Sequence, residues 1–189
     1  MTNFNNIIKE AVNILRDGGV ILYPTDTIWG LGCDATDSDA VKRINDIKKR
    51  TDKHGMLILL DTASKLPYYV KQVPEIAWQL NEVSDSPLTL IYPGARNVAP
   101  ELIASDGSLG IRIVEDEFCS ALIERLRKPL VSTSANITGD VAPENFFEIS
   151  EKIKKSVDYI VPLRQEERGK KTASPIIKIE IDGQFKIIR

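Results

Sequence analysis

The segment that decides the fold reads Gly19-Val20-Ile21-Leu22-Tyr23, followed at once by Pro24-Thr25-Asp26-Thr27-Ile28-Trp29-Gly30-Leu31-Gly32. A short apolar run bounded by glycine and proline predicts a buried strand over 20–23. Proline ends this strand, so the polar side chains that follow are expected at the edge of a sheet. Thr25 and Thr27 offer hydroxyls that both donate and accept hydrogen bonds, and the two later glycines let a backbone approach a ligand closely. The segment predicts either a binding loop or an ordinary polar turn.

Hydrophobic periodicity outside this segment predicts helices and strands in alternation. Helical spacing covers 4–15, 40–47, 118–126 and 146–153, with two further amphipathic segments around 62–70 and 74–83. Short apolar runs predict strands at 20–23, 56–60, 88–92, 109–114, 129–131 and 159–161. Thr36-Asp37-Ser38-Asp39 resembles a capping box, and the chain closes with a hairpin of 176–181 and 185–188 around a two-residue Asp182-Gly183 turn. This order indicates an α/β fold with a mixed, twisted sheet.

Composition is that of one globular domain spanning residues 1–189. The chain is 42% apolar, and no run approaches the ~20 apolar residues that cross a bilayer, so no membrane partner is expected. The first ten residues lack the pattern of a signal peptide. Cys33 and Cys119 are expected to be buried small hydrophobes, which fits a reducing cytoplasm. The charged stretch from Arg164 to Thr172 is interpreted as a mobile loop over the site.

The charge is unevenly distributed. Six basic and two acidic residues fall between positions 42 and 54, a local charge of +4 on a chain whose net charge is −2. This pattern favours a specific anionic ligand over general polyanion binding. Lys48 and Arg50 end a predicted helix, where cations complement the helix dipole or form a clamp for phosphates. His54, the only histidine, is interpreted as an exposed loop residue.

Two further places carry polar side chains in apolar surroundings. Ser132, Thr133, Ser134 and Asn136 follow a predicted strand, either as a turn with a helix cap or as ligands for sugar and phosphate oxygens. Arg112 lies within the predicted strand 109–114 and faces either solvent or a cleft, where it would suit a carboxylate. The chain matches neither GxxxxGK[ST] nor GxGxxG. It also has no His/Cys ligand cluster and no evident Ser-His-Asp set.

Taken in order, these pieces resemble the YrdC/Sua5 family of threonylcarbamoyl-adenylate synthases. The resemblance rests on Pro24 to Gly32, Lys48-Lys49-Arg50 and Ser134-Ala135-Asn136, with support from Ser86-Pro87-Leu88-Thr89, Gly110-Ile111-Arg112, Lys128-Pro129-Leu130 and Ala173-Ser174-Pro175-Ile176-Ile177. It covers about residues 5–180 and is similar in length to the short form of the family. Three places depart from the usual family pattern: Thr51, Asp85-Ser86-Pro87 and Ser174-Pro175.

The resemblance implies a twisted open mixed sheet with flanking helices and a positively charged concave cleft. It implies a nucleotidyltransferase that makes threonylcarbamoyl-AMP and pyrophosphate from L-threonine, bicarbonate and ATP, with Mg²⁺ carried by ATP and no metal site of its own. A downstream transferase complex would then modify adenosine 37 of tRNA. By the same match, Lys48 and Arg50 are catalytic and bind the nucleotide together with Ser134, Asn136 and Ser174. Thr25, Thr27, Arg112 and Ser132 lie near threonine.

Two other functions are compatible with these residues. One is a double-stranded RNA-, tRNA- or ribosome-binding module of the same fold without catalysis, motivated by the local positive charge. The other is a carbamoyl-transfer enzyme with a different acceptor, because related domains occur in hydrogenase maturation proteins. A carbamate is already an anion and needs no strong base to attack a phosphate. A chain with one histidine and no acid/base pair therefore fits the synthase.

Overall fold

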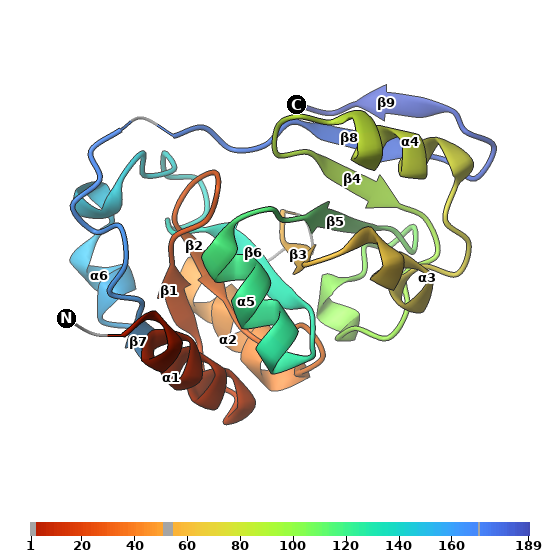
Figure 1. The fold of residues 1–189 in the computed structure, drawn as a ribbon. Helices are drawn as coiled ribbons and strands as arrows, with labels where there is room; N and C mark the ends of the chain where they lie inside the picture. The colour runs from red at the N-terminus through yellow and green to blue at the C-terminus, as the bar shows by residue number, and fades with distance from the viewer. Residues whose placement is uncertain (1–2, 51–54, 170) are drawn as a thin grey trace.

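The computed structural model describes residues 3–50, 55–169 and 171–189, and its centre is a twisted sheet of nine strands (Figure 1). The strands run in the spatial order β7-β1-β2-β6-β3-β5-β4-β8-β9. Their bounds are β1 Ile21–Tyr23, β2 Gly30–Gly32, β3 Leu57–Leu60, β4 Thr89–Tyr92, β5 Leu109–Ile113, β6 Leu130–Ser134, β7 Tyr159–Ile160, β8 Ile176–Ile179 and β9 Phe185–Ile187.

The helices are α1 Phe4–Arg16, α2 Ser38–Lys48, α3 Leu66–Tyr69, α4 Glu75–Val83, α5 Glu117–Leu126 and α6 Glu151–Lys154, with 3₁₀ turns η1 Ala63–Lys65, η2 Pro100–Leu102 and η3 Phe146–Glu148. Helices α1 and α5 lie side by side on one face of the sheet (Figure 1). In β1, Ile21 and Tyr23 pack into the core beneath these two helices, whereas Leu22 packs with α6. This alternation is the two-residue period of a strand buried on both faces.

Strand β6 joins the two halves of the sheet. It pairs antiparallel with β2 on one side and with β3 on the other. Because β6 ends at Ser134, the polar residues that follow it emerge next to the loop between β1 and β2. The mixed sheet confirms the predicted fold class. Cys33 and Cys119 are fully buried, as expected. In the described part of the chain, no helix is long and apolar enough to cross a membrane.

Strand β2 was not predicted. Gly30-Leu31-Gly32 is expected in a loop, but the structure pairs these residues with β1 and extends the pairing to β6. Three residues with two glycines carry no β-propensity of their own. The strand forms because both of its neighbours supply hydrogen-bonding partners.

The closing hairpin has a different turn from the one predicted. The register pairs Ile179 with Phe185, and Glu180 N donates to Gln184 O at 2.8 Å, so three residues, 181–183, form the connection. Gly183 has φ +87° and its N donates to Glu180 O at 3.1 Å. These are features of a three-residue loop with glycine in the left-handed position. The predicted two-residue Asp182-Gly183 turn is therefore wrong.

Two predictions about helix starts are also wrong. The predicted helix over 146–153 is split into η3 and α6, because Asn145 caps the first and Ser150, in an extended conformation, caps the second. In α2 the N-cap is Asp37, whose carboxylate accepts from the backbone N of Asp39 and Ala40. Thr36, the cap implied by the capping-box pattern, lies outside the helix.

Replacing Gly32 with alanine is expected to destabilise the fold. A Cβ atom at Gly32 would lie 2.6 Å from Tyr23 Cε1 and 2.8 Å from Val131 O, both held in the buried sheet. Overpacking of this kind costs about 1–3 kcal/mol. Urea unfolding of G32A should show this loss. G169A is the matched control, because its Cβ meets no atom within 4 Å. Equal stability of the two variants would contradict the packing argument.

Candidate active site

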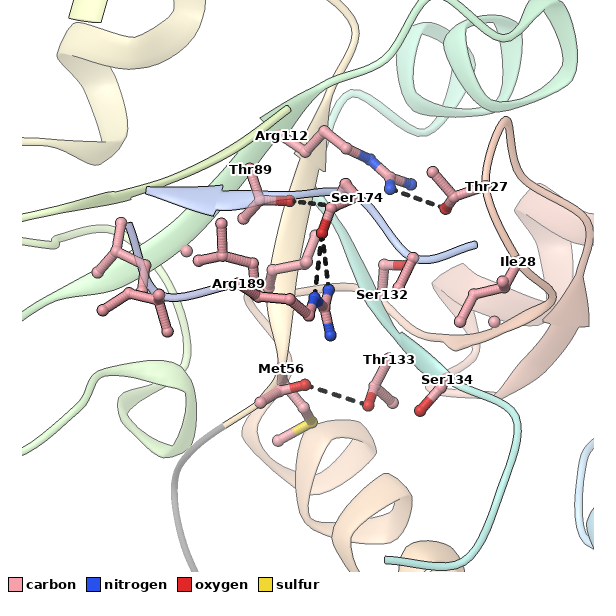
Figure 2. A pocket seen from close by; sticks show the side chains of 18 of the residues that line it. Thr27, Ile28, Met56, Thr89, Arg112, Ser132, Thr133, Ser134, Ser174 and Arg189 are labelled. Carbon is pink, nitrogen blue, oxygen red and sulfur yellow. Dashed lines mark hydrogen bonds between the residues drawn. The ribbon is translucent and has the colours of Figure 1, made fainter. Parts of the chain in front are cut away.

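A cavity of about 500 Å³ opens where the ends of β2 and β6 meet strands β3, β4, β5 and β8 (Figure 2). Its wall combines apolar side chains with a row of hydroxyls. The hydroxyl-bearing residues are Thr27, Thr89, Ser108, Ser132, Thr133, Ser134 and Ser174. The charged side chains that line it belong to Arg112 and Arg189, and its described wall contains no aspartate, glutamate, lysine or histidine residue. The cavity therefore suits an anionic ligand.

The loop between β1 and β2 presents Thr27 to the cavity and keeps Thr25 behind it. Thr25 Oγ1 donates to Ile28 O at 2.8 Å and accepts from Thr27 N at 3.0 Å, so its hydroxyl closes the turn. The two threonine Oγ1 atoms lie 3.0 Å apart. Because the Thr25 proton is committed to Ile28, Thr27 donates in this contact. Thr27 lines the cavity, whereas Thr25 shapes the loop that carries it.

Arg112 faces the cleft and not the solvent, which settles the two alternatives for this strand residue. It is 2% exposed, its Nη1 donates to Thr27 Oγ1 at 2.9 Å, and its Nη2 lies 3.0 Å from Asp26 Oδ1. Burial raises the pKa of Asp26, and the guanidinium of Arg112 acts against that rise. The Nε atom of Arg112 is buried without a hydrogen-bond partner. A buried guanidinium with an unsatisfied donor is suited to a carboxylate.

Lys48 lies behind the cavity wall and anchors the loop after β6. It is 1% exposed, and its Nζ donates to Ser134 O at 2.5 Å and to Asn136 O at 2.7 Å, with Asn136 Oδ1 at 3.4 Å. Thr138 N donates to Lys48 O at 2.9 Å. Burial lowers the pKa of Lys48 to about 7, and the charge of Arg50 acts in the same direction. The ammonium thus turns two carbonyl oxygens of the loop toward itself.

The remaining motif residues lie close to this anchor. The guanidinium of Arg50 borders Gly55, which lines the cavity and whose O accepts from Thr133 Oγ1 at 3.3 Å. Asn136 Nδ2 donates to Asp140 O at 2.7 Å. The structure therefore gathers the residues carried over from both motifs, although Lys48, Arg50 and Asn136 are not among the lining residues. Thr51 and His54 lie outside the described residues.

Ser132, Ser134 and Ser174, which the family resemblance assigns to threonine or nucleotide binding, line the cavity. Ser174 is 3% exposed, and its Oγ lies 2.7 Å from Thr89 Oγ1. Neither Thr89 nor Arg189 is among the predicted site residues. Thr89 belongs to the quoted segment Ser86-Pro87-Leu88-Thr89, so the signal for it was present. Arg189 belongs to none of the quoted pieces, and only the pairing of β9 with β8 brings it to the site.

Residues 161–169 follow β7, and residues 171–175 lead into β8. Arg164 ties the first of these segments to the site loop. Its Nη1 lies 2.6 Å from Asp116 Oδ2 and donates to Thr25 O at 3.4 Å. The predicted mobility of 164–172 stays a prediction.

This arrangement can bind and orient anions, but its described wall holds no side chain that exchanges protons near neutral pH. Among the described residues, no three His, Cys, Asp or Glu side chains are grouped to hold a metal. The fold and site together define an α/β protein with an open mixed sheet and a cavity lined by arginines and hydroxyls.

The chain belongs to the Sua5/YciO/YrdC family, whose model, described as "Telomere recombination", matches residues 13–189. A curated relative named threonylcarbamoyl-AMP synthase, from Pseudoalteromonas translucida, is 29% identical over 94% of this chain and 95% of its own length. A relative of the same name from Coxiella burnetii is 30% identical over 74% of this chain and 76% of its own length. Membership of the family confirms the predicted resemblance.

Solved structures show the same fold. Escherichia coli YciO matches with a TM-score of 0.84 and 28% identity, over 99% of this chain and 89% of that one. Pyrococcus abyssi Sua5 in complex with L-threonine matches with a TM-score of 0.81 and 28% identity, over 94% of this chain. The present chain spans about half of that Sua5 chain, 52%.

Proposed function

We propose that the protein is an L-threonylcarbamoyladenylate synthase, which makes threonylcarbamoyl-AMP and pyrophosphate from L-threonine, bicarbonate and ATP. The observation that carries this proposal is a cavity whose described wall has two arginines and a row of hydroxyls but no aspartate or glutamate residue. Curated relatives bear the name of this activity, and a structural relative is a threonine complex. ATP and the threonine-derived carbamate are both anions, and the arginines and hydroxyls of this wall can stabilise their combined negative charge.

For this reaction the protein must position the reactants and stabilise their negative charge. Bicarbonate takes up a proton and loses water to give CO₂; the neutral threonine amine adds to its carbon, releases a proton to solvent and gives a carbamate. A carbamate oxygen then attacks the α-phosphorus of ATP, and the bond to pyrophosphate breaks. Because the carbamate is an anion, this step needs no general base, in keeping with the described cavity wall. Correct alignment of two reactants can contribute ~7–11 kcal/mol, and each donor to developing charge ~3 kcal/mol.

We assign the polar half of the cavity as follows. Arg112 and Thr27 hold the threonine, with the guanidinium on its carboxylate, and Ser132 lies beside them. Ser134 and Ser174 contact the nucleotide, and the loop that contains Asn136 is held by Lys48. Arg50, next to Gly55, supplies positive charge at the edge of the site. Mg²⁺ enters with ATP as part of that substrate.

The direct test is release of pyrophosphate from Mg-ATP. We expect release only when L-threonine and bicarbonate are both present, and we expect the nucleotide product to be threonylcarbamoyl-AMP by mass spectrometry. Omission of each reactant in turn is the control. Pyrophosphate release that does not depend on threonine, or ATP-independent RNA binding at nanomolar concentration without any turnover, would contradict the proposal.

The product defines what must follow. Threonylcarbamoyl-AMP is a mixed anhydride of a carbamic acid and a phosphate, so a transferase with a nucleophilic acceptor must consume it. We propose that this acceptor is adenosine 37 of tRNA, that a separate transferase complex carries out the transfer, and that the protein works in the cytoplasm.

A further inference from the structure

We propose that Arg164 is a positioning residue for the threonine site: its guanidinium neutralises Asp116 and so keeps the charge of Arg112 available to the carboxylate of the substrate. That this carboxylate belongs to threonine rests on the proposed function; the balance of charges rests on the geometry of the described residues. Arg164 does not line the substrate cavity. It lies in the segment that follows β7, outside every motif on which the family resemblance depends.

A second cavity explains why this balance is needed. Asp26, the ion-pair partner of Arg112, lines a cavity of about 350 Å³ that is separate from the substrate cavity. Three more acidic residues line it, Asp85, Glu115 and Asp116, and its described wall contains no lysine, arginine or histidine. Carboxylates gathered in one wall create a negative potential around them. A substrate carboxylate at Arg112 must therefore bind close to an acidic cavity.

The buried carboxylate of Asp116 acts directly on the pair of Arg112 and Asp26. The side chain of Asp116 is 5% exposed and that of Asp26 is 17% exposed. Burial raises the pKa of Asp26, the guanidinium of Arg112 opposes the rise, and the charge of Asp116 adds to it. Two carboxylates that interact in this way compete for the same positive charge. Without a cation of its own, Asp116 would weaken the attraction of Arg112 for a substrate anion.

Arg164 supplies that cation. Its Nη1 lies 2.6 Å from Asp116 Oδ2 and donates to Thr25 O at 3.4 Å. The other carboxylate oxygen of Asp116 accepts from Cys119 N at 2.9 Å, which fixes Asp116 as the N-cap of α5. One oxygen of Asp116 therefore belongs to the helix and the second to Arg164. The ion pair connects α5, the loop between β1 and β2, and the segment after β7.

The backbone at Arg164 has a conformation that favours glycine. Its φ is +55°, in the left-handed region that residues with a Cβ rarely adopt. Such a conformation costs free energy, which the contacts to Asp116 and Thr25 offset. Glycine at this position relieves the strain and removes the cation at the same time. R164G therefore tests the charge with little disturbance of the fold.

The experiment measures the binding of L-threonine and of Mg-ATP separately by calorimetry, in the wild type, R164G and R164K. We expect R164G to raise the Kd for threonine about 10-fold, because an unbalanced carboxylate near the surface acts through an effective dielectric constant of about 20. The Kd for Mg-ATP should change less than about threefold, since this effect falls with distance. R164K keeps the charge and should recover most of the threonine affinity.

D116N distinguishes charge balance from a purely structural tether. Asparagine is also a favourable N-cap, so D116N removes the charge and keeps the cap of α5. If Arg164 acts by neutralising Asp116, its loss matters little once Asp116 is neutral. The double variant D116N/R164G should then bind threonine within about threefold of D116N, a non-additive result. A tether through Thr25 O predicts instead that the double variant is as weak as R164G.

R168G is the matched control, because Arg168 is an exposed arginine of the same segment whose guanidinium lies 4.8 Å from the ring centroid of Phe147. It should bind threonine as the wild type does, and thermal unfolding shows whether each variant is folded. Wild-type threonine affinity in a folded R164G, an equal loss in R168G, or a double variant as weak as R164G would overturn the proposal. A wild type that binds threonine, loses it in R164G and releases no pyrophosphate would refute the proposed function and leave this inference standing.

Discussion

Replacing Lys48 with alanine lowers kcat/KM for pyrophosphate release by about 10²-fold or more. The substitution removes a buried cation and leaves the oxygens of Ser134 and Asn136 without their donor. Each unsatisfied buried group costs about 1–3 kcal/mol. The loop after β6 is therefore expected to rearrange, and this change lies next to the cavity. K42A is the control, because Lys42 is an exposed cation on the same helix. A normal rate in K48A would refute the anchoring role.

The pH dependence of ATP binding gives a second measurement on Lys48. Its pKa is lowered to about 7 by burial. The ammonium donates three hydrogen bonds and the neutral amine two, so the loop is held less firmly as the pH rises through 7. The unfolded chain keeps this proton up to a pKa of about 10.4, so the contribution of Lys48 to folding stability increases over the same range.

We therefore expect the ATP affinity of the wild type, relative to that of K48M, to fall between pH 6 and pH 9. Over the same range, the titration of Lys48 should not lower the thermal stability. The comparison with K48M removes the titration of ATP itself, which both proteins share. Parallel profiles for the two proteins would contradict the expectation.

Replacing Arg112 with methionine raises the KM for L-threonine by about 10²-fold or more. Arg112 carries the buried donors that face the carboxylate in the proposed complex, and charge-assisted bonds of this kind are strong. The same change leaves Asp26 without its partner at 3.0 Å. Removal of one member of a largely buried pair is destabilising, so calorimetry of threonine binding must be accompanied by thermal unfolding.

R112K and T27V separate the two effects. R112K keeps the charge next to Asp26. Lysine has no planar guanidinium, so it cannot bind Thr27 and a carboxylate at the same time. T27V removes the hydroxyl that accepts from Arg112 at 2.9 Å and keeps the charge pair. We expect intermediate losses of threonine affinity in both. If R112M stays folded and binds threonine normally, the assignment of the carboxylate to Arg112 is wrong.

The parts of the fold predicted from sequence are those whose residues carry a strong local pattern. Helix α1 has regular apolar spacing over 13 residues, and strand β5 alternates Leu109, Ile111 and Ile113 with other residues, so the sequence pattern predicts both elements. Strand β2 could not be predicted, because Gly30 and Gly32 have no side chains to show a period and their pairing depends on β1 and β6. The hairpin turn was wrong because an Asp-Gly pair fits loops of two or three residues, and the register of β8 with β9 decides between them.

The same distinction applies to the site. Ser134 and Arg112 were found because motifs surround them. Their orientation was not predicted, because side chains alternate along a strand and the sequence does not show which face lines the cleft. Lys48 was predicted as a ligand of phosphate, and the structure shows an ammonium occupied by loop carbonyls. Arg189 was not predicted, because a single basic residue after an apolar strand forms no sequence pattern that indicates a site. Its position becomes clear only from the pairing of β9 with β8.

The two fully buried cysteines have a practical consequence. Burial raises the pKa of both Cys33 and Cys119, so neither thiol offers a reactive thiolate in the folded state. One cysteine introduced at the cavity mouth, for example in place of Ala142, becomes the selective target for a maleimide dye. A fluorescence titration of such a labelled protein can report the order in which substrates enter, without removal of any native residue from the core.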